Sequence, residues 1–84
     1  MIRLLYFAWV RERIGRAEEE VALPPEVRTV ADLCDWLAAR SEGHAMALAD
    51  RDRLRLAVNQ DYADWSAPLA AGDEVAIFPP VTGG

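Results

Sequence analysis

The sequence predicts an α+β domain in which one main helix packs on one face of a mixed β-sheet. Three observations support this class. The chain has 84 residues, the length of one small domain. Its apolar residues recur with the spacing of strands in most segments and with the spacing of a helix in one. These segments follow the order strand, strand, helix, strand, strand, with a very short return strand around Tyr62.

Residues 2–9 predict a central strand, because apolar side chains occupy both of its alternating faces. One face would hold Ile2, Leu4 and Tyr6, and the other would hold Leu5, Phe7 and Trp9. The charged stretch 10–15 ends on a glycine and predicts a short helical turn. Residues 18–23 predict a second strand that forms a hairpin with the first. Pro24-Pro25 end it, because proline has no N–H to donate to a neighbouring strand.

The main helix is predicted to begin after Thr29, a good N-cap residue, with Asp32 placed to complete a capping box. A single apolar stripe at spacing i, i+3, i+4, i+7 should lie across the sheet, and it consists of Val30, Leu33, Cys34 and Leu37. Residues 41–43 are expected to end this helix. Residues 44–50 fit either a short second helix or an irregular crossover.

Residues 53–58 predict a strand with one side toward the core, because every second residue from Leu54 is apolar. Turn-forming residues follow at 59–61. After an irregular loop, Gly72-Asp73 turn the chain into a last strand at residues 74–78. Periodicity alone does not say which of these strands are neighbours.

Two prolines directly after Phe78 end the last strand and push the residues before them toward extended backbone. Residues 1–78 are therefore predicted to form the folded domain, and residues 79–84 a C-terminal tail that projects from it. The tail consists of Pro79, Pro80, Val81, Thr82, Gly83 and Gly84. Because glycine has no side chain, the last two residues can pass through a narrow gap into another protein's active site.

The reactive group of such a tail is the α-carboxylate of Gly84. A chain-terminal carboxyl group ordinarily has a pKa of about 3.3–3.7, so it is ionised and inert near neutral pH and another enzyme must activate it. Joining it to AMP would make an acyl donor that an amine, a thiolate or a persulfide can attack. The alternative interpretation is an ordinary frayed terminus that ends in two glycines.

Nine basic and fourteen acidic side chains give a net charge of −5, which argues against nucleic acid as a partner. The sequence contains no apolar run long enough to span a membrane. Its short apolar stretch 4–10 runs into charged residues rather than into a signal-peptide cleavage site. We therefore expect a cytoplasmic protein that binds neither nucleic acid nor membrane.

Cys34 is the only cysteine and His44 the only histidine. One cysteine excludes an internal disulfide, and so few ligands of these two types argue against a metal site. Cys34 falls on the apolar stripe of the predicted helix, so we expect it to be buried and structural rather than the carrier of a sulfur atom. His44 lies in a polar connector, and we expect no specific role for it.

Residues 72–84, with the pattern Gly-Asp-Glu-Val followed by Pro-Pro-Val-Thr-Gly-Gly, resemble the C-terminus of the small, sulfur-carrying subunits of molybdopterin synthase, the MoaD family. Residues 2–8, Arg11-Glu12 with Gly15, and residues 57–60 resemble the same family, so the motifs span almost the whole chain. The resemblance implies a ubiquitin-like β-grasp fold. In that fold the first and last strands lie side by side at the centre, and the tail leaves one end.

The resemblance also implies a function. A partner enzyme would adenylate Gly84 and convert it to a thiocarboxylate, with Gly83 beside it in the same channel. The sulfur would then pass to a pterin precursor, cyclic pyranopterin monophosphate, in molybdenum cofactor biosynthesis. The chain would not be catalytic alone, and would hold no permanent cofactor or metal. ATP would be used by the activating partner.

Three partners follow from the resemblance: the large catalytic subunit of molybdopterin synthase in a heterotetramer, an E1-like adenylyltransferase of the MoeB type, and a sulfur-donating enzyme. Phe7, Tyr62 and Phe78 match the family's hydrophobic docking surface, although Tyr62 departs toward a more polar ring. Arg11 would assist docking, and Pro79, Pro80, Val81 and Thr82 would contact the partner along the tail. On physical grounds alone, each aromatic residue fits a core position equally well.

Three other functions remain open. The same fold and activation would suit a sulfur carrier for thiamine synthesis, although Pro79-Pro80 and Phe78 resemble the molybdopterin branch. A protein modifier would join Gly84 to lysine amines. A plain binding module would make no use of the Gly-Gly terminus.

Overall fold

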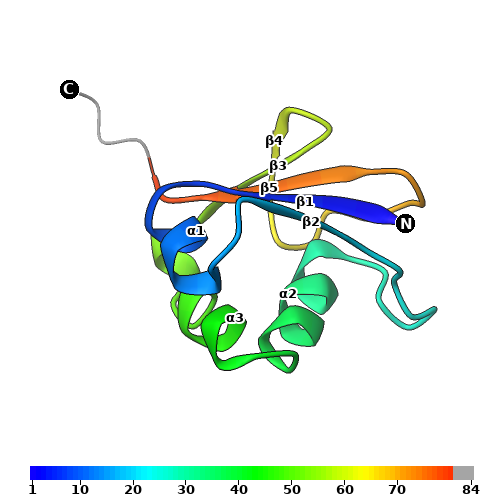
Figure 1. Cartoon of the computed structure of the whole chain (residues 1–84). Helices are drawn as coiled ribbons and strands as arrows, with labels where there is room; N and C mark the ends of the chain where they lie inside the picture. The colour runs from blue at the N-terminus through cyan, green and yellow to red at the C-terminus, as the bar shows by residue number, and fades with distance from the viewer. Residues whose placement is uncertain (81–84) are drawn as a thin grey trace.

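The computed structural model describes residues 1–80, which form a five-stranded mixed sheet with all helices on one side (Figure 1). The strands are β1 (Ile2–Tyr6), β2 (Glu18–Val21), β3 (Arg55–Val58), β4 (Asp61–Ala63) and β5 (Glu74–Phe78). The helices are α1 (Ala8–Ile14), α2 (Val30–Ala38) and α3 (Glu42–Ala47), with a 3-10 turn, η1, at Arg51–Arg53. The predicted α+β class is confirmed, and α2 is the main helix.

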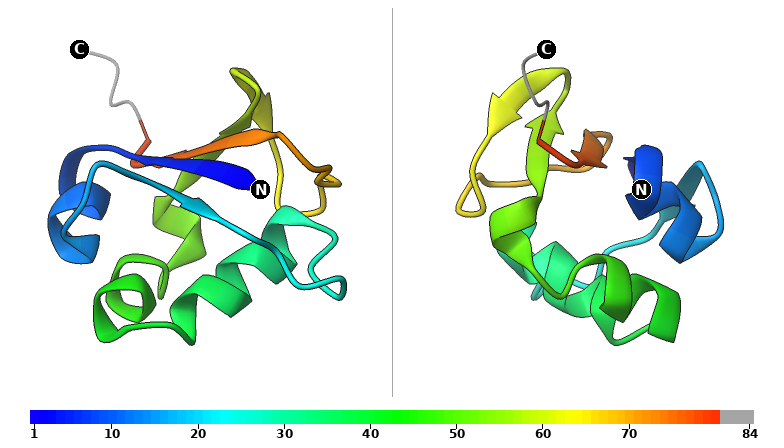
Figure 2. Two further views of the ribbon diagram at one scale, coloured as in Figure 1. Left: turned by 45° about the vertical axis from the view of Figure 1, so that its right-hand side comes forward. Right: turned by 90° about the vertical axis from the view of Figure 1, so that its left-hand side faces the viewer.

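The strand order in the sheet is β2-β1-β5-β3-β4. The central pair, β1 and β5, is parallel, with Arg3 opposite Glu74 and Tyr6 opposite Ile77. The other neighbouring pairs are antiparallel, including the predicted hairpin partners β1 and β2. The first and last strands therefore lie side by side at the centre, as the resemblance implied, and Figure 2 shows this central pair from two further directions.

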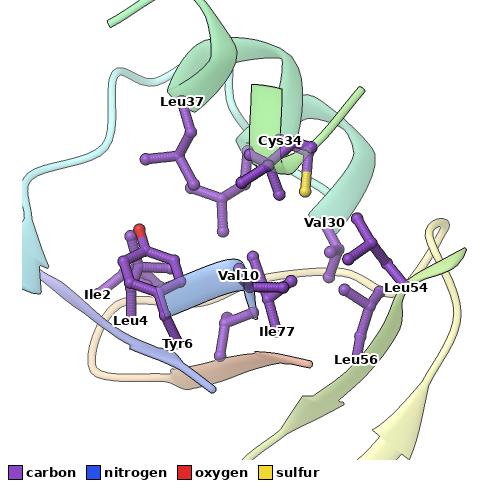
Figure 3. Close-up of a cluster of buried hydrophobic side chains, with 14 of the residues drawn as sticks. Ile2, Leu4, Tyr6, Val10, Val30, Cys34, Leu37, Leu54, Leu56 and Ile77 are labelled. Atoms are coloured by element: carbon purple, nitrogen blue, oxygen red, sulfur yellow. The ribbon is translucent and has the colours of Figure 1, made fainter. Parts of the chain in front are cut away.

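The core lies between the sheet and α2 (Figure 3). Alternate residues of the central strands point into it, for example Leu4 and Ile77, which are fully buried. All members of the predicted helix stripe are also fully buried, namely Val30, Leu33, Cys34 and Leu37. Burial of this apolar surface supplies most of the stabilisation of such a small domain, because each fully buried aliphatic side chain contributes about 1.5–3 kcal/mol.

The start of α2 is fixed by the predicted capping box. The Oγ1 of Thr29 accepts a hydrogen bond from the backbone N–H of Asp32 at 3.2 Å. The Oδ2 of Asp32 accepts in return from the backbone N–H groups of Arg28 and Thr29, at 3.0 and 3.2 Å. The hydrogen bond from the Arg28 N–H has the largest effect on Asp32. Together these bonds hold the pKa of Asp32 below its ordinary value. The cap thus orients the helix whose stripe closes the core.

The predicted strand at residues 2–9 is wrong beyond Tyr6. The chain turns at Ala8, which has a left-handed φ of 53°, and α1 begins there. Trp9 therefore lies in α1 rather than in the strand, and Val10 is fully buried from the same helix. A continuous apolar run fits a buried strand and a helix equally well, so the sequence pattern did not show where one ended. The helical turn predicted at 10–15 is the second part of this helix, which Gly15 ends with a φ of 93°.

The connection after α2 contains a short helix, which is one of the two structures predicted for residues 44–50. Helix α2 ends at Ala38, before the predicted stop, and Ser41 caps α3 by accepting a hydrogen bond from the backbone N–H of His44 at 3.1 Å. Gly43 lets α3 approach α1 closely, because a Cβ at this position would lie 2.6 Å from the carbonyl O of Arg13. Glycine is therefore required at this crossing.

The turn between β3 and β4 is attached to the start of β5. Asn59 and Gln60 both have positive φ, 51° and 72°, as a tight two-residue hairpin requires. The side chain of Asn59 accepts from the backbone N–H of Glu74 at 3.0 Å and donates to Oδ1 of Asp73 at 3.0 Å. These contacts fix the start of β5, the strand that ends at Phe78.

Candidate functional site

Three aromatic side chains gather on the face of the sheet that the helices leave uncovered. Phe7 is 47% exposed and Tyr62 80% exposed, whereas Phe78 is half-buried between them. The ring centroids of Phe7 and Phe78 are 6.5 Å apart in an edge-to-face arrangement, and those of Tyr62 and Phe78 are 6.1 Å apart. We call these three residues the aromatic patch. Exposed aromatic clusters of this kind are typical of protein docking surfaces.

Strand register explains why the three rings meet. Tyr6 points into the core, so the next residue, Phe7, points to the opposite face. Its backbone N–H donates to the carbonyl O of Ile77 at 3.3 Å, which places it beside the end of β5. Phe78 follows the buried Ile77 and therefore also faces outward. Residues from the first and last strands thus become neighbours only because β1 and β5 are paired.

A shallow hollow of about 460 Å³ adjoins the aromatic patch. It is lined by Arg55, Leu56, Tyr62, Ala63, Phe78 and Pro80. Pro79 is half-buried and Pro80 is exposed at the end of β5, so the chain leaves the domain beside the patch. Val81, Thr82, Gly83 and Gly84, which sequence reasoning assigned to the tail, lie outside the described residues. A partner that covers the aromatic patch would also meet the start of the tail.

Arg11 is exposed on α1, and its proposed part in docking stays a prediction. The neighbouring Arg13 lies over the ring of Trp9 at 4.5 Å from its centroid. Arg16 lies 3.5 Å from Oε1 of Glu19. These two arginines therefore have contacts within the domain.

Cys34 lies on α2 inside the core, with no exposed surface. Burial raises the pKa of its thiol to about 12. A thiol that stays protonated and inaccessible is neither a good nucleophile nor a site for a transferable sulfur atom. The prediction that Cys34 is buried is confirmed.

The prediction that His44 has no specific role is wrong, because it belongs to a buried polar network. Its Nε2 lies 2.8 Å from Oε2 of Glu19, and its Nδ1 lies 2.6 Å from Oγ of Ser41. The hydroxyl of Tyr6 donates to the same Oε2 of Glu19 at 2.7 Å. Arg40 lies 3.6 Å from Oε1 of Glu19. The network joins β1, β2 and α3 beneath the edge of the sheet.

Burial and hydrogen bonding have opposite effects on the pKa of Glu19 in this network. Burial by itself favours a protonated Glu19, but the hydrogen bonds from His44 and Tyr6 outweigh it and hold the pKa of Glu19 below its ordinary value. Burial, followed by the bond to Glu19, raises the pKa of Tyr6. Sequence reasoning missed Glu19, although it shares the inward face of β2 with Val21 and so was detectable from strand alternation.

Within residues 1–80, no group of three or more histidine, cysteine, aspartate or glutamate side chains is placed to hold a metal ion. No helix in this part of the chain has the length and apolar character needed to cross a membrane.

The sequence and the fold both match known proteins. Residues 4–84 match the ThiS family. The chain is 49% identical to the molybdopterin synthase sulfur carrier subunit of Escherichia coli K12, and the alignment covers all of both chains.

Two solved structures share the fold. One is a putative molybdopterin converting factor subunit 1 from Pyrococcus furiosus, 35% identical with a TM-score of 0.78 over 95% of this chain and 97% of that one. The other is small archaeal modifier protein 1 of Haloferax volcanii, 30% identical with a TM-score of 0.75 over 95% and 97% of the two chains. The family match covers nearly the whole chain, and this level of sequence identity supports the same family. Both findings agree with the observed order of strands in the sheet. The chain therefore belongs to the ThiS family of ubiquitin-like β-grasp proteins, within the group of molybdopterin synthase sulfur carrier subunits.

Proposed function

We propose that this protein is the sulfur carrier subunit of a molybdopterin synthase and that Gly84 carries the sulfur. The observation that supports this best is the aromatic patch at the end of β5, beside the point where the chain continues into Pro79-Pro80. The full-length relative at 49% identity is named for the same role. In this proposal the folded domain binds the partner protein, and the C-terminal tail carries the sulfur to the partner's active site.

The proposed chemistry needs two steps on the Gly84 carboxylate. First, the carboxylate oxygen attacks the α-phosphate of ATP in an E1-like adenylyltransferase of the MoeB type, which releases pyrophosphate and leaves an acyl adenylate. Hydrosulfide (HS⁻) supplied by a donor enzyme then attacks the acyl carbon, so that a C–S bond forms as the C–O bond to AMP breaks, and loss of the S–H proton leaves a thiocarboxylate. Gly83 and Gly84 present no side chain that would obstruct either attack.

The thiocarboxylate then enters the large synthase subunit, where its sulfur passes to cyclic pyranopterin monophosphate. We propose that the two kinds of subunit form a heterotetramer and that this takes place in the cytoplasm. The contribution of the small domain is positional, because the aromatic patch fixes where the tail begins. Such positioning holds the two reacting groups next to each other, so that their reaction no longer depends on a bimolecular encounter. This effect supplies much of an enzyme's rate enhancement.

A second candidate function is protein modification, since a 30% identical protein of the same fold is named as a modifier. In that case a lysine amine would attack the activated Gly84 instead of a sulfur nucleophile. The two functions differ in the product at Gly84.

The intact mass of the protein isolated from its own cells tests the proposal. We expect a fraction in which one oxygen is replaced by sulfur, and fragmentation should place the exchange at Gly84. The matched control is a variant lacking Gly84, which should show no exchange. Amide-linked adducts to other proteins without any thiocarboxylate would contradict the proposed function and favour the modifier.

Replacing Phe78 with aspartate is expected to weaken binding to the large subunit by about 10-fold or more, because it puts a charge into the middle of the aromatic patch. The side chain is only half-buried, so the thermal midpoint should fall much less than for a core substitution. Isothermal titration and thermal melting measure the two effects. Ala22→Asp, at an exposed position outside the patch, is the control, and it should bind as the wild type does. A Phe78→Asp protein that binds normally would contradict the assigned docking face.

A further inference from the structure

Arg55 lines two adjoining hollows, of which the first lies beside the aromatic patch. It is directly opposite Phe78 in the β3–β5 pairing. The first hollow, of about 460 Å³, has Tyr62 and Phe78 among its lining residues. The second, of about 360 Å³, extends toward Trp65 and shares Arg55 with the first. Arg55 thus lines the hollow that adjoins the aromatic patch.

The Arg55 guanidinium is held in place by its own chain. Its Nη1 donates to the carbonyl O of Leu54 at 2.8 Å and to that of Asp52 at 3.2 Å. A guanidinium has five N–H donors, and within residues 1–80 the hydrogen bonds of Arg55 use Nη1 alone, so the Nε and Nη2 edge can bind a ligand. A cation fixed in this way loses little conformational entropy when it binds.

Arg55 is one of five arginines without an ion pair within residues 1–80, and among these five it is the one that lines the hollow beside the aromatic patch. Arg3, Arg16, Arg40 and Arg51 each pair with a carboxylate of the domain. No ion pair joins Arg55 to a carboxylate within residues 1–80. The chain as a whole has a net charge of −5 and disfavours acidic partners. Arg55 therefore marks a local site where a carboxylate is favoured.

The residues that line the two hollows determine in which of them a ligand carboxylate would bind to Arg55. Asp52 and Asp64 line the second hollow, and its other arginine, Arg51, is already paired with Asp35, so an anion is disfavoured there. The first hollow is lined mainly by apolar and aromatic groups, and Arg55 is its only charged residue. An aliphatic or aromatic side chain fits this hollow, with a carboxylate beside it. The Nε and Nη2 edge of a guanidinium suits a carboxylate because both oxygens are bound at once.

We propose that Arg55 is a specificity residue of the docking surface: it binds a carboxylate of the large synthase subunit, whose neighbouring apolar side chain fills the hollow between Tyr62 and Phe78. This inference rests on the proposed function. Apolar contact at the aromatic patch supplies affinity, and Arg55 selects partners with an acidic residue at that point. Charge pairs at the rim of an interface act mainly in this way, on partner choice and association rate.

Binding of the source organism's large synthase subunit to three variants tests the inference. Arg55→Met keeps the apolar stem of the side chain and removes the charge, and it should bind about tenfold more weakly. Arg55→Lys should recover part of the loss, since it restores the charge but not the paired geometry. Arg28→Met is the matched control, because Arg28 is exposed outside both hollows, and it should bind normally.

Salt dependence gives a second measurement. The affinity of the wild type should fall more steeply with salt than that of Arg55→Met, because an exposed charge pair is screened. If Arg55→Met binds like the wild type while Phe78→Asp is weakened, the assignment of Arg55 is wrong and the docking face stands. If the wild type does not bind the large subunit at all, the proposed function and this inference both fail.

Discussion

A variant with one alanine added after Gly84 is expected to keep its fold and its docking surface and to lose sulfur transfer completely. In the proposed function, the acyl carbon must reach an activating nucleotide in one partner and a pterin precursor in another. Reacting atoms have to approach to about 3–3.5 Å, and one added residue moves the carboxylate by roughly 3.3–3.6 Å. The added methyl group would also enter a channel that accepts glycine.

Incubation with the activating enzyme, ATP and a sulfur source, followed by intact-mass analysis, measures this effect. The extended protein should show neither adenylate nor thiocarboxylate, yet should melt normally and bind the large subunit. The control carries its extra alanine at the opposite end, next to the exposed Met1, and should be fully active. If the extended protein, shown by mass to be uncleaved, still supported molybdopterin formation, Gly84 would not be the working group.

The largest loss of stability is expected from Glu19→Ala. This change leaves the hydroxyl of Tyr6 and Nε2 of His44 buried without their shared acceptor. Removing one partner from a buried charged network costs about 3–5 kcal/mol, a large part of the stability of a small domain. Glu20→Ala is the matched control, because Glu20 is the next residue in β2 but exposed, and it should change the free energy of unfolding by less than about 0.5 kcal/mol.

Urea unfolding at several pH values separates the charge of Glu19 from its shape. The pKa of Glu19 is lower in the folded protein than its ordinary value of about 4.5, which applies in the unfolded chain. Its contribution is therefore present above that value and is lost as the pH falls through the folded-state pKa. The stability difference between the wild type and Glu19→Gln should shrink over this range. Asp32, Asp64 and Asp73 also have lowered pKa values but are common to both proteins. A difference that does not change with pH would show that the charge of Glu19 contributes nothing.

Local patterns were sufficient to predict the elements that have one buried face. The stripe from Val30 to Leu37 and its cap at Thr29 are specified by residues close together in the chain, and both are present. The end of β1 was not predictable in this way, because the run from Ile2 to Trp9 is apolar on both faces. Its division at Ala8 depends on how α1 packs against the rest of the domain.

The aromatic patch and the Glu19 network needed information that periodicity does not contain. Phe7 and Phe78 are 71 positions apart in the sequence, and their contact follows from the pairing of β1 with β5. That pairing was predicted from the family resemblance rather than from the pattern of either strand. The burial of Glu19 and His44 depends in the same way on α3 bringing His44 to Glu19 of β2, which no local motif indicated.

The central position of β5 has a consequence for biosynthesis. Strand β5 separates β1 from β3, so a nascent chain that lacks residues 74–78 has no strand to join the two parts of its sheet. Pairing β1 with β5 closes a long loop, which lowers the conformational entropy of the chain. The contacts that offset this entropy loss form only once residues 74–78 have been synthesised. A ribosome-bound chain therefore completes its fold only after it has synthesised the strand that leads into the tail. A translation product that stops within β5 would expose apolar surface and become a substrate for cellular proteases. Such a truncated chain, which lacks the C-terminal tail, would therefore be degraded before it could bind a partner protein in place of the complete chain.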